Sequence, residues 1–343
     1  MGTLSGPFTH RNLQIFLIHG DTQLENRHYS TLGEALAKGI VVVKETGNVS
    51  ELSIQNLSKE VTVFLNAGDI VKGGRQDRTI RDDLILQTRS GLVPLPSFCV
   101  ENGRWTKRGA EDAAVFSENN KVLTSRKLKI ASRYGGNQSE VWSGVAEQQG
   151  KLNNNVSRLY GRNVEIRNSA SASSLQLTLE NKELEKISKQ YLDALLPILN
   201  DKPDVIGFAY AINGEINSAE VYNNKALFRA LWPKLLDSAV TEALTENDSD
   251  RTFQPVQAND LKAFFETAVS GSATERLVSK STQVRTITTP GTVLFETVDL
   301  QADDLWIHKS FINKGKETVV VPLDRRSLRY QNQQRLDSGS RRP

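Results

Sequence analysis

The sequence predicts an α+β protein in which an antiparallel β-rich N-terminal half packs against a helical C-terminal half that contains a hairpin. Short segments rich in β-branched residues follow one another closely before residue 90, with connections too short for crossover helices. Helical periodicity becomes common after residue 136, and an Asn-Gly pair there separates two alternating apolar runs. The first half is therefore expected to form a sandwich or a partly open barrel.

The strands of the N-terminal half are expected where β-branched and other apolar residues cluster or alternate between turn signals. These segments are residues 13–18, 39–45, 51–57, 61–67 and 84–88. A short helix is expected over residues 30–39, because Ser30 can cap its start and Gly39 can end it.

A hairpin is expected around Asn102-Gly103, a pair that suits a two-residue turn with positive φ at both positions. This register places Glu101 opposite Arg104 on neighbouring strands. Strand alternation then puts Cys99 on the same face as these two side chains. That face is suited to line a site.

The C-terminal half is expected to consist mainly of helices, with one hairpin and a final group of strands. Helices are expected over 138–148, from Asn181 to about 199, over 223–246 as two helices that meet at Pro233, and over 259–270. The hairpin is expected to pair 205–212 with 215–221 around Asn213-Gly214, and strands are expected to return over 282–313. Residues 149–174 are rich in Asn, Ser and Gly and are expected to form a loop.

Residues 1–312 are expected to form one α+β body, with a β-rich part (1–135) and a helix-rich part with returning strands (136–312). Residues 313–343 are expected to hold the end of the last strand and a mobile basic tail. The basis is that residues 324–343 contain six arginines and two aspartates.

Composition argues against several classes of protein. Hydrophobic residues make up 38% and charged residues 24%, as in ordinary soluble proteins, and the formal charge of +3 gives no argument for nucleic-acid binding. The lone Cys99 excludes an intrachain disulfide, and four scattered histidines lack the spacing of a zinc site, so neither metal nor cofactor is expected. No apolar run reaches the ~20 residues that span a bilayer. The compartment stays open between the cytoplasm and export with a leader absent from this sequence.

The stretch GDIVKGGRQDR, residues 68–78, is the main candidate for a binding site. Gly73 and Gly74 allow backbone N–H groups to converge on an anion. The side chains of Lys72, Arg75 and Arg78 are suited to contact phosphate or carboxylate, and those of Gln76 and Asp77 to contact a hydroxyl. The alternative is a tight turn whose charges form weak surface pairs.

The expected first hairpin adds three candidates. Arg104 could hold an anion while Glu101 orients it or acts as a general base, and the alternative is a structural cross-strand ion pair. Cys99 becomes a nucleophile only if its pKa is lowered by the neighbouring arginines, and the alternative is a small buried side chain.

Two further groups of residues attract attention. Basic residues gather in one part of the sequence and would create a positive field if they shared a face: Arg104, Lys107, Arg108, Arg126, Lys127, Lys129 and Arg133. The second hairpin carries Glu215 and Glu220, whose strand parity places them on different faces and argues against a joint acid–base role.

Several motifs, taken together in this order and spacing, resemble a known bacterial family. They are TLGEALAKGIVVVKETG, VTVFLNAGDIVKGGRQDRTI, CVENGRW and INGEINSAEVYNNKALFRALWPKLL. The family is the ARG and Rhodanese-Phosphatase-superfamily-associated protein domain (ARPP), where ARG stands for ADP-ribosylglycohydrolase, and the resemblance runs from about residue 12 to 312. Its glycine-rich motif maps onto Gly68 and residues 72–78, and its hairpin motif onto residues 99–105. This chain has Asp69 where the family pattern has glutamate and Arg75 where lysine is usual. Both differences keep the charge but alter reach and geometry, so it stays open whether ligand geometry is shared.

The resemblance implies a link to NAD or ADP-ribose metabolism and brings no catalytic mechanism. Three functions follow as hypotheses. The first is binding of a phosphorylated or otherwise anionic small molecule, with ADP-ribose-like nucleotides suggested by the family name. The second is a hydrolase with Glu101 or Asp77 as general base. The third is a structural or protein-interaction module without a small ligand. Whether the chain is an enzyme, and whether it has a protein partner, stays open.

Overall fold

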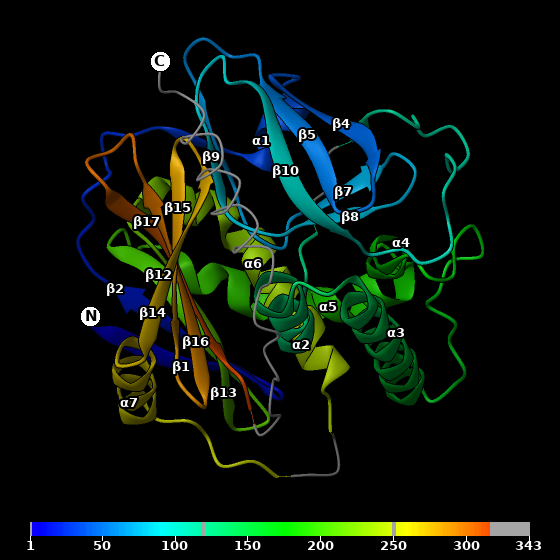
Figure 1. Cartoon of the computed structure of the whole chain (residues 1–343). Helices are drawn as coiled ribbons and strands as arrows, with labels where there is room; N and C mark the ends of the chain where they lie inside the picture. Colours follow the sequence, from blue (N-terminus) through cyan, green and yellow to red (C-terminus); the bar gives the residue numbers. More distant parts are fainter. Residues whose placement is uncertain (1, 118–120, 249–251, 316–343) are drawn as a thin grey trace, which may run out of the picture.

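The largest element of the computed structural model, which describes residues 2–117, 121–248 and 252–315, is an antiparallel sheet of eight strands (Figure 1). Its order is β1 (Leu4–His10), β2 (Leu13–His19), β12 (Val205–Ile212), β13 (Glu215–Tyr222), β17 (Leu305–Asn313), β16 (Thr292–Asp299), β15 (Thr282–Thr288) and β14 (Ser272–Ser279). The two N-terminal strands thus continue a sheet that the C-terminal strands build.

A second sheet of six strands almost closes on itself. Its order is β11 (Phe116–Ser117), β7 (Ile70–Gly73), β8 (Arg78–Ile80), β10 (Gly91–Cys99), β5 (Glu51–Asn56) and β4 (Val41–Asn48). A bridge between Lys44 and Val115 brings β4 back beside the β11 end, so this sheet is close to a barrel. A small third sheet contains β3 (Tyr29–Thr31), β6 (Thr62–Leu65) and β9 (Leu84–Leu86).

Helices cover the large sheet and fill the space below the barrel (Figure 1). They are α1 (Leu32–Ala37), α2 (Arg126–Ile130), a π-helical turn (Ala131–Gly135), α3 (Gln138–Tyr160), α4 (Leu175–Leu179), α5 (Lys182–Leu195), a 3₁₀ turn (Leu196–Leu199), α6 (Lys225–Thr245) and α7 (Ala258–Val269).

Strand β2 explains why the large sheet needs helices on both faces. Its residues Leu13, Ile15 and Leu17 join the core under α6, and Phe16 and Ile18 join the core under α7. Because successive side chains of a strand point to opposite faces, the continuous apolar run of β2 must be covered twice.

The predicted α+β class describes the chain, but the predicted split into a β-rich N-terminal half and a helical C-terminal half is wrong. Six of the eight strands of the large sheet come from residues 205–313. The N-terminal strands β1 and β2 extend that sheet instead of staying with the barrel, because the two apolar faces of β2 are buried only between the two helical layers.

The predicted loop over residues 149–174 is also wrong in its first part, because α3 continues to Tyr160. The polar side chains that suggested a loop make buried hydrogen bonds. Gln149 donates from Nε2 to Thr178 Oγ1 (2.8 Å), and Asn155 donates from Nδ2 to the carbonyl oxygens of Leu244 (3.0 Å) and Thr245 (2.9 Å). The polar residues of this part of α3 thus include side-chain amides that bind neighbouring helices.

Other local predictions fare differently. The hairpin around Asn213-Gly214 is confirmed, with φ of 53° and 76° at the two turn positions. The helix from Asn181 is confirmed, and Asn181 caps it. The break at Pro233 is wrong, since α6 runs through it as one helix that Asn224 caps.

The predicted basic tail lies outside the described residues. Within the described ranges, no helix combines the length and apolar character needed to cross a membrane.

Candidate functional site

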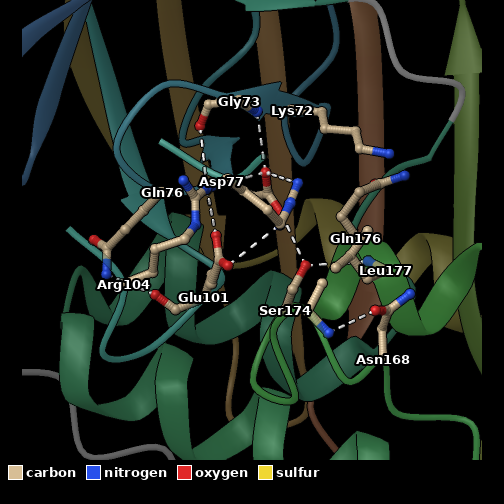
Figure 2. Close-up of polar contacts among 12 residues, drawn as sticks. Lys72, Gly73, Gln76, Asp77, Glu101, Arg104, Asn168, Ser174, Gln176 and Leu177 are labelled. Carbon is tan, nitrogen blue, oxygen red and sulfur yellow. Dashed lines mark hydrogen bonds and ion pairs between the residues drawn. The ribbon is translucent and has the colours of Figure 1, made fainter. Parts of the chain in front are cut away.

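The glycine-rich motif and the segment after β10 meet at one end of the barrel (Figure 2). The turn between β7 and β8 brings Gln76 and Asp77 against Glu101, and Gln76 donates from Nε2 to the carbonyl oxygen of Glu101 (2.8 Å). The start of α4 approaches from the other side with Ser174. The motif and the hairpin segment thus form one polar cluster, named here the motif cluster.

Two fully buried carboxylates lie at the centre of the motif cluster. Asp77 accepts hydrogen bonds from the Gly73 backbone N–H (3.1 Å) and from the Ser174 hydroxyl (2.8 Å). Glu101 accepts one from the Asp77 backbone N–H (3.1 Å). The backbone N–H of Gly73, expected to face a ligand anion, therefore binds the protein's own Asp77.

Two arginines neutralise these carboxylates. Arg104 lies 2.7 Å from Glu101 and 3.7 Å from Asp77, and its guanidinium also donates to the carbonyl oxygen of Gly74 (3.1 Å). Arg108 donates from one nitrogen to both Asp77 (3.0 Å) and Glu101 (3.2 Å). Arg108 also pairs with Glu111 (2.8 Å), so three carboxylates and two guanidinium groups form one ionic network.

The same network moves the pKa values of the two carboxyl groups in opposite directions. Burial raises the pKa of Asp77, and this outweighs the lowering by Arg108 and by the Gly73 N–H. Burial also acts to raise the pKa of Glu101, but the hydrogen bonds from Arg104 and other donors outweigh it, so that pKa is lowered. Opposed shifts are typical of acid–base pairs, yet both groups here are inaccessible to solvent.

The remaining predicted cations lie around this network. Lys72 pairs with Glu180 of the α4 end (2.7 Å). Arg75 is exposed, and its guanidinium carbon lies 5.3 Å from the centroid of the Trp105 ring, with no hydrogen-bond partner for the side chain among the residues described. Among the predicted cations, Arg75 is therefore the one whose guanidinium is least engaged by other protein groups.

Arg78 and Cys99 form a buried pair on the other side of the turn. The Arg78 guanidinium lies 2.8 Å from the Cys99 sulfur and also contacts the carbonyl oxygen of Val49. Burial raises the pKa of the Cys99 thiol to about 11, and this outweighs the lowering by Arg78. The thiol is therefore protonated at neutral pH, which is its unreactive form.

The predicted hairpin around Asn102-Gly103 is wrong. Strand β10 ends at Cys99, its last residues pair with β8, and residues 104–106 form no strand. The pair of Glu101 and Arg104 still forms, as neighbours three apart in an irregular segment that folds back over the turn of the motif.

Gly74 offers a direct test of how tightly this turn is packed. Its φ is +54°, and an added Cβ would lie 2.3 Å from the Cζ atom of the buried Phe116 ring. Gly109 has nearly the same φ (+56°) with open space around it. Gly74→Ala should therefore lower the free energy of unfolding by about 1–3 kcal/mol more than Gly109→Ala, as measured by urea denaturation. Equal losses would show that Phe116 moves aside.

A second buried polar cluster, named here the histidine cluster, was not predicted as a site, although Glu220, Lys129 and Arg133 were noted in the sequence. His308 of β17 lies between Asp83 (Nδ1 to Oδ2, 2.8 Å) and Glu220 of β13 (Nε2 to Oε2, 3.0 Å). All three are buried. Burial acts to lower the pKa of His308, but the two carboxylates outweigh it and raise that pKa to about 9.

Cations of α2 and of the π-helical turn complete the histidine cluster. Lys129 lies 3.5 Å from Glu220, and Arg133 lies 3.6 Å from Asp83. The spacing of Lys129 and Arg133, four residues apart, places both on one helical face and was the available sequence signal. Asp83 and His308 lie 225 residues apart, and no local pattern joins them.

An open cavity of about 330 Å³ lies between α2, α3, the end of α6 and the turn of the second hairpin. Its ionisable lining residues are Arg126, Lys127, Glu147, Lys151, Glu215, Glu242, Glu246 and Lys314. Glu242 connects it to the histidine cluster, because the Tyr210 hydroxyl donates to Glu242 (2.8 Å) and lies 3.5 Å from Lys129. This cavity combines polar walls with the volume of a small-molecule pocket.

Comparison with known proteins supports the resemblance. A family model that describes the ARG and Rhodanese-Phosphatase-superfamily-associated Protein domain matches residues 3–312. No curated protein and no solved structure matched the chain. Because the family model covers most of the sequence, the chain belongs to the ARG and Rhodanese-Phosphatase-superfamily-associated Protein domain family.

Proposed function

We propose that the protein binds an anionic small molecule in the 330 Å³ cavity. The observation that carries this proposal is Arg126, which lines the cavity half-buried. Its backbone N–H donates to Glu242 (2.6 Å), while its guanidinium has no hydrogen-bond or ion-pair partner in the described part of the chain. A guanidinium at the wall of a cavity is suited to bind phosphate or carboxylate by two parallel hydrogen bonds.

The four cationic and four acidic side chains of the cavity balance in number, and the preference for an anion rests on how they are paired. The carboxylates Glu147 and Glu246 are paired with lysines, at 2.6 Å from Lys127 and 2.9 Å from Lys151. Glu242 accepts hydrogen bonds from the Arg126 N–H and from a tyrosine hydroxyl. Most of the negative charge is thus engaged within the protein, and the Arg126 charge is left to attract a ligand.

The volume lies at the lower end of the range of small-molecule pockets, about 300–1,000 Å³. The family resemblance makes ADP-ribose the first ligand to test and ribose 5-phosphate its smaller part. The hydrolase alternative is less favoured, because its proposed bases Asp77 and Glu101 are fully buried and bonded to arginines.

The ligand site predicted from the sequence stays a competing proposal for the same function. It consists of Lys72, Gly73, Gly74, Arg75, Gln76, Arg78 and Arg104. Within it, Arg75 is the residue whose head group could meet a ligand without breaking an internal ion pair. Arg126 and Arg75 therefore form a matched pair of substitutions.

Binding of inorganic phosphate, ribose 5-phosphate and ADP-ribose should be measured by calorimetry and thermal denaturation for the wild type, Arg126→Ala and Arg75→Ala. We expect Arg126→Ala to weaken binding about 10- to 100-fold, the effect of a lost charge-assisted contact, and Arg75→Ala to leave it unchanged. At 100 times the dissociation constant the ligand should stabilise the wild type by about 2.7 kcal/mol.

Each other outcome contradicts part of the proposal. Loss of binding in Arg75→Ala alone would move the site to the glycine-rich motif. Failure of all three compounds to bind the wild type would contradict anion binding and favour a structural or protein-interaction role.

A further inference from the structure

A serine, a histidine and an aspartate form a hydrogen-bonded chain at one end of the large sheet, away from both polar clusters. The Ser5 hydroxyl lies 2.7 Å from Nε2 of His19, and Nδ1 of His19 lies 2.9 Å from Oδ2 of Asp204. The imidazole thus has a hydroxyl on one nitrogen and a carboxylate on the other. This is the order of contacts that activates a serine in hydrolases of several unrelated folds.

Three neighbouring strands position these side chains. Ser5 of β1 lies opposite Leu17 of β2, so strand alternation places Ser5 and His19 on the same face of the sheet. Asp204 directly precedes β12, the strand on the other side of β2, and its carbonyl oxygen accepts the Gly20 N–H (3.0 Å). Paired strands hold such a group of side chains more precisely than loops do.

The contacts determine which nitrogen of His19 carries the proton. A carboxylate can only accept a hydrogen bond, so Nδ1 of the neutral ring carries the proton and donates it to Asp204. Nε2 is then the acceptor for the Ser5 hydroxyl. The hydrogen bond from His19 also lowers the pKa of Asp204, which keeps this group a carboxylate at neutral pH. His19 is therefore arranged as a general base toward Ser5.

The three side chains lie at the surface. Ser5 is half-buried on β1, the edge strand of the sheet, and the side chains of His19 and Asp204 are 15% and 60% exposed. Small molecules can therefore approach Ser5 from solvent. Because solvent screens the charge of Asp204, its effect on His19 should be weaker than that of a buried carboxylate.

We propose that Ser5, His19 and Asp204 form a second site, which hydrolyses small carboxylic esters such as acetyl esters. Esters are the expected class, because an exposed site offers limited electrostatic stabilisation and an alcohol leaves more readily than an amine. This site lies at the opposite end of β12 from the 330 Å³ cavity, whose wall includes Ile212. It does not depend on the anion site, and it is separate from the hydrolase alternative, whose bases belong to the motif cluster.

The reaction balances with these residues and water. The Ser5 Oγ atom forms a bond to the ester carbonyl carbon while its proton moves to Nε2 of His19. The bond to the alcohol oxygen then breaks, the alcohol leaves with the Nε2 proton, and an acyl-serine remains. Water attacks this acyl group and gives a proton to Nε2, which returns it to Ser5 as the carboxylic acid leaves. We assign the backbone N–H of Gly6, an exposed residue next to Ser5, to stabilise the carbonyl oxygen as it becomes negative.

Two measurements on the full chain test this activity. They are the hydrolysis of p-nitrophenyl acetate and covalent labelling by a fluorophosphonate, with the labelled residue identified by peptide mass spectrometry. We expect the label on Ser5 of the wild type. Ser5→Ala and His19→Gln should each lower the rate of hydrolysis at least about 100-fold, the range of general-base catalysis. Asp204→Asn should lower it by about 10-fold, because the exposed carboxylate is screened.

Exposed residues elsewhere supply matched controls. Ser139→Ala removes another exposed serine, and His28→Gln removes an exposed imidazole that could attack the ester by itself. Both variants should keep the rate and the labelling of the wild type.

The labelled residue is identified on the wild type, so this result holds even if a variant fails to fold. A label on a residue other than Ser5, or no label, would overturn the inference. Equal rates in the wild type and in folded Ser5→Ala would also overturn it, and the three side chains would then be a structural link between strands.

Discussion

Raising the pH from 6 to 9 should lower the free energy of unfolding of the wild type by about 3 kcal/mol through His308. The folded-state pKa of about 9 lies above the ordinary value of 6.5 because Asp83 and Glu220 face the two ring nitrogens. The stabilisation by the protonated ring is fully present below pH 6.5, and it is lost as the pH rises through 9. Urea denaturation at a series of pH values measures this loss.

His308→Gln is the matched control, because an amide keeps polar atoms in this position without a proton that titrates in this window. The variant should be less stable at pH 6 and should show a much flatter profile between pH 6 and 9. Cys99, whose pKa is raised to about 11, adds its own dependence only above about pH 9. Equal slopes in the wild type and His308→Gln would contradict the assignment of the charge to His308.

The two carboxylates of the histidine cluster, Asp83 and Glu220, make stability depend on pH in the acid range, where stability falls as the pH is lowered. Burial acts to raise the pKa of Asp83, but His308 and Arg133 outweigh it and hold that pKa well below its usual range. The pKa of Glu220 is also lowered, since the contacts from His308 and Lys129 outweigh its burial. Their stabilisation is present above their unfolded pKa values and is lost as the pH falls. The free energy of unfolding should therefore be highest between the acid range, where Asp83 and Glu220 take up protons, and the alkaline range, where His308 loses its proton.

Elements governed by local chemistry could be predicted from the sequence. The turn at Asn213-Gly214 needs two residues that accept positive φ, and no distant contact changes this requirement. The helix after Asn181 follows from a capping side chain and a regular apolar stripe.

Elements governed by contacts between residues distant in the chain could not be predicted from the sequence. Pro233 stays inside α6 because that helix is buried along most of its length, and tertiary packing outweighs the preference for a break. Strand β2 pairs with β12, which begins almost 190 residues later, and no periodicity in the sequence predicts that pairing. The predicted split of the chain failed for this reason.

The glycine-rich motif shows the same limit at the level of a site. The sequence indicates an anion beside Gly73, and in the structure the atoms bonded to that N–H belong to the side chain of Asp77. Arg108 and Ser174, which complete the motif cluster, come from outside the motif. Residue spacing alone cannot distinguish a backbone N–H group that binds a ligand anion from one that binds a carboxylate of the same chain, as Gly73 does.

Arg108→Met should lower the free energy of unfolding at pH 7 by about 3–5 kcal/mol. Arg108 donates hydrogen bonds to both Asp77 and Glu101, and its loss leaves one arginine, Arg104, for these two buried carboxylates. The pair of Lys72 and Glu180 is the matched control, because both side chains are partly exposed (24% and 36%). Lys72→Met should cost at most about 1 kcal/mol.

Charge and packing make different predictions for this variant. If the loss comes from an unpaired carboxylate, protonation of Asp77 at low pH should shrink the difference between Arg108→Met and the wild type, since the pKa of Asp77 is already raised by burial. Asp77→Asn should then be destabilising in the wild type and close to neutral in Arg108→Met. A deficit that is independent of pH, with additive effects of the two substitutions, would instead assign the role of Arg108 to packing of residues 102–115 over the turn.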